Sequence, residues 1–326
     1  MERDTVRALV IAGGGIRGNI PSVILWHILQ SIRLNTKNLD LGYKDILDFA
    51  AGSSVGGIIA APLICGIPIS DINKALRDKD IWQRRYAPWT PKWKREPILD
   101  RLSKVLTDNK VRNGADITFG DIDDMYNGSK LLMVTTVNKN RKYPAAENMF
   151  FKSWQQRWRH FKVMDAVAAT FAASYYFGNI NNDQLQKVLA DGGEGNQNSP
   201  IAQAMGSINR RIRKVRPGAD IRLLYIGTGF YTEYRSYKKA SRMGMVREAA
   251  NVPMMAMEQA WETQSYLAMT QAEIDPRFGF KMINPPLPNK ELSSLDRIKD
   301  ISKYVSIGDE VGKEVAEDVA QFWGYK

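Results

Sequence analysis

Ser54 lies in a segment whose residue types could hold a catalytic nucleophile. It is the third residue of Gly52-Ser53-Ser54-Val55-Gly56, which fits the G-x-S-x-G pattern of a nucleophile elbow. The flanking glycines, Gly52 and Gly56, let the backbone turn sharply enough to expose the serine oxygen, and the N-terminus of a following helix favours negative charge. The same pattern also suits a small-residue turn that serves only close packing, so the context has to decide.

A glycine-rich loop near the N-terminus is the second candidate for chemistry. It consists of Gly13, Gly14, Gly15, Ile16, Arg17 and Gly18. Such a loop can direct successive backbone N–H groups into one concavity and so form an oxyanion hole. Each well-placed donor there stabilises the transition state of ester cleavage by about 3 to 4 kcal/mol. We expect Arg17 to buttress the loop rather than to contact substrate.

The same loop offers an alternative, because its first, third and last glycines also match the dinucleotide-binding pattern G-x-G-x-x-G. That function needs an acidic residue at the end of the second strand, about 20 residues further on. Asp40 has this distance but follows the sequence NTKNL, which is no strand. The second predicted strand ends in GSSVG instead. A nucleotide-dependent enzyme therefore stays open as an alternative.

The histidines restrict how Ser54 could be activated, because the chain contains only His27 and His160. A triad in the order of the α/β-hydrolases needs a histidine after the acid, late in the chain. We expect His27 to be a surface or packing residue of a helix, and His160 lies among basic and aromatic residues. If Ser54 is activated, a carboxylate must therefore act as its base.

Asp191 is the candidate carboxylate. It follows the apolar run KVLA and precedes two glycines, which allow its carboxylate to approach another group closely. In a Ser–Asp dyad the aspartate accepts the serine proton during attack and returns it to the leaving alcohol. Taken alone, the sequence DGG is more often a turn than a catalytic site.

These residues fall at the junctions of predicted elements. Residues 7–12 read as a strand, a loop follows, and NIPSVILWHILQSIRL has helical spacing; ILDFAAGSSVGGIIAAPLI repeats the pattern. Two such units imply a parallel sheet with helical crossovers. The remaining sequence predicts a sheet of five or six strands, with strands at 131–137, 188–190 and 221–229 and helices near 96–107, 164–173 and 200–213.

The whole chain, 1–326, reads as a single domain. The composition changes after Gly229, so we expect a core over about 5–230 and a helical C-terminal elaboration over about 231–326. The uncharged stretch between Asp48 and Asp71 is long enough to cross a bilayer. Its glycines and prolines instead indicate a buried strand, a tight turn and a packed helix.

Elbow, glycine loop and late DGG, in this order, resemble the patatin-like phospholipase family. AATFAASYYFG (168–178) is similar to the alanine-rich stretch before the family's aspartate, and LLYIGTG (223–229) to a later core strand. The resemblance implies a three-layer α/β/α fold with a mostly parallel central sheet. It also implies Ser54 as nucleophile, Asp191 as base and the amides around Gly14, Gly15 and Ile16 as the oxyanion hole. No metal and no cofactor are expected.

The amino-acid composition of the chain indicates which kinds of partner it could bind. The formal charge of +11 favours anionic partners, and one cysteine excludes an internal disulfide. The N-terminus lacks the pattern of a secretory signal, so we expect a cytoplasmic protein that is peripheral at the membrane when active. Tryptophans alternate with cations at 81–95 and 150–162, as suits a phospholipid surface. A non-catalytic adaptor for membranes or nucleic acid is the alternative, although no nucleic acid polymer is expected as partner, and the oligomeric state stays open.

Two further basic clusters could be solvated faces or anion sites: RRIRKVR (210–216) and RSYKKASR (235–242). Some bacterial enzymes of the patatin-like family in antiphage signalling are switched on by cyclic nucleotides. Activation of this kind is a hypothesis for the present chain.

Overall fold

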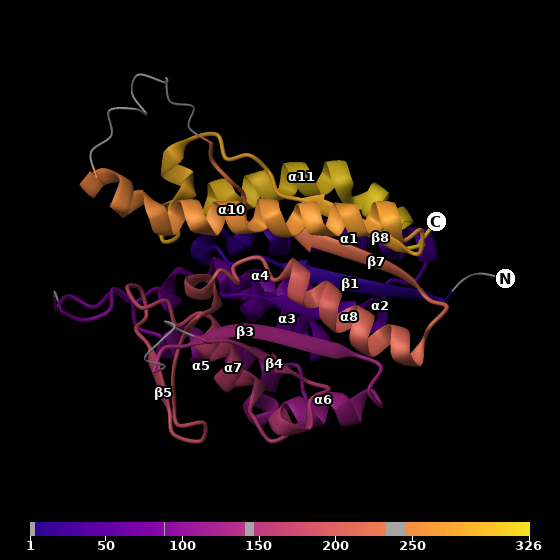
Figure 1. The fold of residues 1–326 in the computed structure, drawn as a ribbon, viewed down its shortest axis with the longest axis horizontal. Helices are drawn as coiled ribbons and strands as arrows, with labels where there is room; N and C mark the ends of the chain where they lie inside the picture. The colour runs from indigo at the N-terminus through magenta and orange to yellow at the C-terminus, as the bar shows by residue number, and fades with distance from the viewer. Residues whose placement is uncertain (1–3, 88, 141–146, 233–244) are drawn as a thin grey trace.

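A mixed β-sheet forms the centre of the protein (Figure 1). The computed structural model describes residues 4–87, 89–140, 147–232 and 245–326, without the side chains of 245–259. Over these residues the sheet has eight strands in the order β5-β6-β3-β2-β1-β7-β8, with β4 also paired to β3. The strands are β1 (Thr5–Ile11), β2 (Phe49–Gly52), β3 (Leu131–Asn138), β4 (Glu147–Lys152), β5 (Ile180–Asn182), β6 (Lys187–Asp191), β7 (Asp220–Ile226) and β8 (Phe278–Ile283).

Helices cover both faces of the sheet, which gives the three layers that the sequence predicted. In β1, Leu9 and Ile11 belong to the core shared with α1, α3 and α11, whereas Ala8 and Val10 belong to the core shared with α8 and α10. This alternation follows from the two-residue period of a strand. The helices are α1 (Asn19–Thr36), α2 (Tyr43–Ile46), α3 (Val55–Ile64), α4 (Ile69–Arg77), α5 (Glu96–Asp108), α6 (Phe119–Met125), α7 (Val163–Thr170), α8 (Ile201–Val215), α10 (Met245–Ile274) and α11 (Ile301–Phe322).

The predicted strands and helices are all present, but the expectation of five or six strands was wrong. Three strands were missed: β4, β5 and β8. β4 overlaps the start of the 150–162 segment, where the interleaved aromatic and basic residues had suggested only a surface segment. β8 pairs in parallel with β7, so the C-terminal part contributes a strand as well as helices.

The two edges of β3 explain how distant segments meet. β4 pairs with Met133–Asn138 along one edge, and β2 pairs with Leu131–Val134 along the other. Beyond the end of β2, β6 takes over the same edge and places Asp191 opposite Thr136. The ends of β2 and β6 therefore face each other across a short gap.

The C-terminal helix α11 packs closely against α1 (Figure 1). A Cβ on Gly308 would lie 2.8 Å from the carbonyl oxygen of Ile20, and one on Gly312 would lie 2.7 Å from Cδ2 of His27. These two glycines therefore permit a helix–helix approach that any larger residue would prevent.

The uncharged stretch after Asp48 forms β2, a turn and α3, as the sequence indicated. Among the helices of the described residues, none combines the length and the apolar character that a bilayer crossing requires.

Candidate active site

Ser54 occupies a strained turn between β2 and α3. Its φ of 53° and ψ of −126° are unusual for a residue other than glycine. A Cβ on Gly52 would lie 2.2 Å from the backbone of Gly56, and a Cβ on Gly56 would lie 2.2 Å from the carbonyl oxygen of Ile11. Both flanking glycines are therefore required, and they hold the serine directly before the N-terminus of a helix.

Asp191 ends β6 and is buried. Burial raises the pKa of its carboxyl from 3.8 to about 7, although hydrogen bonds from the Ser54 hydroxyl and the Gly193 amide act in the opposite direction. The Gly193 N–H lies 2.7 Å from Oδ1 of Asp191, and the negative charge of Glu194 raises the pKa further. A carboxylate with a pKa near neutral, hydrogen-bonded to a serine, is suited to act as a general base.

Two backbone N–H groups of the glycine loop are used in hydrogen bonds within the protein, and two others are available to a ligand. The Gly13 N–H donates to the Asn198 carbonyl at 2.9 Å, and the Ile16 N–H donates to the Leu295 carbonyl at 2.8 Å. The N–H groups of Gly14 and Gly15 have no acceptor within the part of the chain that the structure describes. Both residues line the cavity that contains Ser54, so these two amides are available to donate to a group bound there.

Arg17 and Gly18 hold the glycine loop in place through contacts with other parts of the chain. The Arg17 guanidinium donates to the carbonyl of Gly229 at 3.1 Å and lies 3.5 Å from that of Gly14, so it buttresses the loop as expected. A Cβ on Gly18 would lie 2.2 Å from Cγ2 of Val55, so glycine is needed where the loop contacts the elbow.

Thr170 contacts the turn at Ser54, a contact that the sequence analysis missed. Its hydroxyl oxygen accepts the backbone N–H of Ser54 at 2.9 Å, and its side chain is completely buried. A Cβ on Gly57 would lie 2.7 Å from Cγ2 of Thr170, so Gly57 lets α7 approach the elbow. The only signal in the sequence was its place in the alanine-rich stretch before Asp191.

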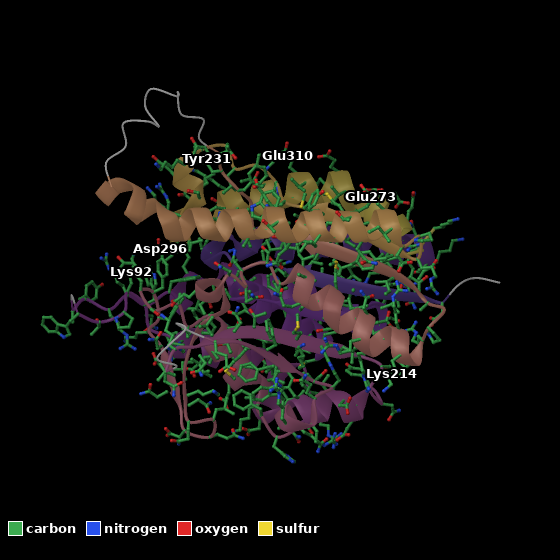
Figure 2. All side chains as sticks on the ribbon, viewed as in Figure 1. Lys92, Lys214, Tyr231, Glu273, Asp296 and Glu310 are labelled. Carbon is green, nitrogen blue, oxygen red and sulfur yellow. The ribbon has the colours of Figure 1, made fainter. Side chains whose placement is uncertain are left out.

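Ser54, Asp191, Gly14 and Gly15 line one cavity of about 280 Å³. Its wall includes six aromatic side chains: Trp82, Trp93, Phe171, Tyr175, Tyr176 and Phe177. Lys92, which forms an ion pair with Asp296 from the cavity lining, connects the 81–95 segment to the C-terminal part of the chain (Figure 2).

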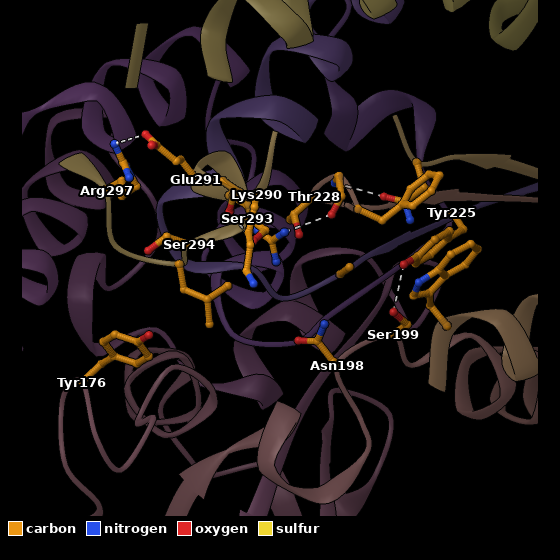
Figure 3. Close-up of a pocket in the computed structure, with 17 residues that line it drawn as sticks. Tyr176, Asn198, Ser199, Tyr225, Thr228, Lys290, Glu291, Ser293, Ser294 and Arg297 are labelled. Atoms are coloured by element: carbon orange, nitrogen blue, oxygen red, sulfur yellow. Dashed lines mark hydrogen bonds and ion pairs between the residues drawn. The ribbon is translucent and has the colours of Figure 1, made fainter. Parts of the chain in front are cut away.

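A second cavity of about 550 Å³ adjoins the first, with Tyr176, Asn198 and Leu295 in both linings. Its lining is more polar and includes the cation Arg17 as well as Lys290 and Arg297, which are labelled in Figure 3. Arg297 forms an ion pair with Glu291, and Ser199 hydrogen-bonds Tyr225 at 2.8 Å.

The histidines and the dinucleotide alternative find no support in this geometry. His27 bonds Asp309 at 2.8 Å between α1 and α11, and His160 is exposed. β2 ends at Gly52, and Ser53 and Ser54 follow it, so the described chain has no carboxylate at the end of the second strand, where the dinucleotide function requires one.

A family model described as patatin-like phospholipase matches residues 9–205, which contain the glycine loop, the elbow and Asp191. The chain belongs to the patatin-like phospholipase family. The sequence prediction of this family is therefore confirmed, and with it the α/β fold.

Two relatives within the family are bacterial proteins named cGAMP-activated phospholipase. The one from Escherichia coli is 28% identical over an aligned length of 206 residues, and the match covers 59% of this chain and 53% of the relative. The one from Vibrio cholerae is 27% identical over an aligned length of 246 residues, and the match covers 69% of this chain and 65% of the relative. The chain thus spans less than two thirds of the length of these relatives. Among solved structures, ExoU of Pseudomonas aeruginosa in complex with SpcU has a TM-score of 0.48 at 12% identity, covering 99% of this chain and 53% of its own.

Proposed function

We propose that this chain is a lipid acyl hydrolase that cleaves carboxylic ester bonds of membrane phospholipids. Ser54 is the nucleophile, Asp191 is the general base, and the amides of Gly14 and Gly15 form the oxyanion hole. The observation that carries this proposal is the convergence of these four groups in one aromatic-walled cavity.

The first half of the reaction forms an acyl-enzyme. The Ser54 oxygen attacks the ester carbonyl carbon while its proton passes to the Asp191 carboxylate. The carbonyl oxygen becomes an oxyanion that accepts hydrogen bonds from the Gly14 and Gly15 amides. The bond to the leaving oxygen then breaks, and Asp191 donates its proton to the departing alcohol.

The second half releases the fatty acid. Asp191 takes a proton from a water molecule, which attacks the acyl carbon, and the second tetrahedral intermediate uses the same two amides. When the intermediate collapses, Ser54 recovers its proton. A carboxyl pKa of about 7 suits both directions of proton transfer, because neither protonation state is strongly favoured at neutral pH.

The two cavities suit the two parts of a phospholipid. The aromatic wall beside Ser54 fits an acyl chain, and the neighbouring polar cavity with Lys290 and Arg297 fits a glycerophosphate headgroup. Phosphate is recognised by such cations through charge-assisted hydrogen bonds.

The 81–95 segment is the proposed point of membrane contact. Tyr86 and Trp89 are 89% and 87% exposed, whereas Trp82 and Trp93 pack edge-to-face and line the active-site cavity. Exposed aromatic side chains of this kind insert at the headgroup level of a bilayer. In the 150–162 segment Trp158 is buried against Phe151, so that segment offers less to a membrane.

We further propose that a cyclic nucleotide activates the enzyme in antiphage defence. The names of the two bacterial relatives support this regulation, and the net charge of +11 favours an anionic effector.

A fluorophosphonate probe together with lipid mass spectrometry tests the catalytic proposal. We expect an adduct on Ser54, released fatty acid and lysophospholipid from vesicles, and loss of both activity and adduct in Ser54→Ala. Asp191→Ala should lose activity while it keeps the fold, measured by circular dichroism. Full hydrolysis by either variant would refute the dyad. A wild-type protein without adduct or hydrolysis, with and without cGAMP, would favour the adaptor alternative.

A further inference from the structure

A basic groove lies outside the active site, between α8 and the end of β4. It has a volume of about 440 Å³. Figure 2 shows Lys214, at one end of this groove, far from Lys92 and Asp296, which lie at the active-site cavity. The groove is lined by Phe150, Lys152, Trp154, Gln155, Gln203, Gly206, Ser207, Arg210, Arg211 and Lys214.

The α8 residues of the groove recur every three or four positions, from Gln203 through Ser207 and Arg210 to Lys214, so they form one stripe of the helix. Gly206 also lines the groove and leaves space in it, because a Cβ there would meet no atom within 4 Å.

The cations of the groove lack acidic partners. Four of its lining residues are cationic and none is acidic, and the described residues include no ion pair to any of these four. On another face of α8, by contrast, Arg213 pairs with Asp275, and Arg216, directly after the end of the helix, pairs with Asp4 and Asp48. The charges of these two arginines are therefore neutralised, whereas the charge of the groove is not.

Like charges are also held close together there. Burial, followed by the charges of Arg210 and Arg157, lowers the pKa of the half-buried Lys152. The Lys152 amino group donates to Ser207 at 3.0 Å and lies 5.4 Å and 5.5 Å from the ring centres of Phe150 and Trp154. An anion bound among these cations would relieve their mutual repulsion.

We propose that this groove binds the phosphates of a nucleotide, with the aromatic rings of Phe150 and Trp154 beside the base, and that it is the site of the cyclic nucleotide activator. The proposal rests on the proposed function for the identity of the ligand. Phosphate needs several convergent cations, and aromatic rings provide the flat contact that a nucleobase uses and a lipid headgroup lacks.

The fold gives such a ligand a direct path to the catalytic loop. α8 begins at Ile201, three residues after Asn198. The Asn198 carbonyl accepts the Gly13 N–H at 2.9 Å, and its side-chain amide donates to the Gly13 carbonyl at 3.3 Å. A ligand that fixes α8 therefore also fixes the loop that carries the oxyanion donors.

Calorimetry with cGAMP tests the groove directly. Gly206→Phe fills the groove, whereas Gly206→Ala adds only a methyl group and is the matched control. We expect Gly206→Phe and the double variant Arg210→Gln/Lys214→Gln to weaken binding by at least about tenfold, because each removes space or phosphate contacts. Gly206→Ala and Lys104→Gln, an exposed lysine on α5, should bind as the wild type does.

Activity on vesicles, measured with and without cGAMP, separates the groove from the catalytic proposal. The groove variants should keep wild-type hydrolysis without cGAMP and lose its stimulation. If cGAMP binds and activates all variants equally, the groove is not the site, while the proposed function stands. If the wild type neither binds cGAMP nor responds to it, both activation and the groove proposal fail, while lipid hydrolysis is judged by its own assay. Groove variants that lose binding to anionic vesicles but keep cGAMP binding would make the groove a membrane contact instead.

Discussion

Replacement of Asp191 by asparagine should stabilise the protein at neutral and alkaline pH. The carboxyl of Asp191 has its pKa raised from 3.8 to about 7, mainly by burial. This rise is about three units, and each unit corresponds to about 1.4 kcal/mol, so ionisation in the native state costs about 4 kcal/mol. Asparagine keeps the shape and the acceptor for Gly193 but carries no charge.

The sign of the effect follows from proton binding. Below pH 3.8 the carboxyl is protonated in both the native and the unfolded chain, and the variant should match the wild type. Between 3.8 and about 7 the native state holds one proton more, so wild-type stability falls as pH rises. The advantage of Asp191→Asn should therefore grow with pH and level off above about 7.

Urea unfolding of both proteins at several pH values from 5 to 8 measures this difference. Asp183→Asn, which replaces an exposed carboxyl, controls for the removal of one charge. A gap between Asp191→Asn and wild type that does not change with pH would refute the argument that burial destabilises this carboxylate.

Two further predictions concern the active site, and a third concerns membrane contact. Thr170→Val removes the acceptor of the Ser54 N–H; we expect kcat to fall about tenfold with little change in KM, and Thr170→Ser to restore it. The pH profile of kcat/KM should rise with a midpoint near 7, and Glu194→Gln should move that midpoint to lower pH, because a neighbouring negative charge is lost; an unmoved midpoint contradicts this. Trp89→Ala should lower hydrolysis of vesicles several-fold but leave hydrolysis of a soluble short-chain ester unchanged; equal losses on both substrates would exclude a membrane role.

Local sequence patterns determined much of this protein. The strand–turn–helix around GSSVG placed Ser54, because small residues at fixed spacing permit only a few backbone turns. The shortage of histidines directed attention to a carboxylate, and the apolar run before DGG selected Asp191. These signals are local, and each needs only a few neighbouring residues.

Tertiary contacts decided the rest. β8 was not predicted, and its place in the sheet depends on parallel pairing with β7, a strand that is distant in the sequence. Nor could the sequence indicate which loop amides are free, since Asn198 and Leu295 occupy two of them from distant parts of the chain.

The meeting of Ser54 and Asp191 depends above all on β3. β2 stops at Gly52, opposite Val134, and β6 takes up the same edge at Thr136. Strand pairing joins backbone groups that are remote in sequence, and a strand does not encode which neighbour will use which part of its edge. The residue types came from the sequence, and the shared edge of β3 brings them together.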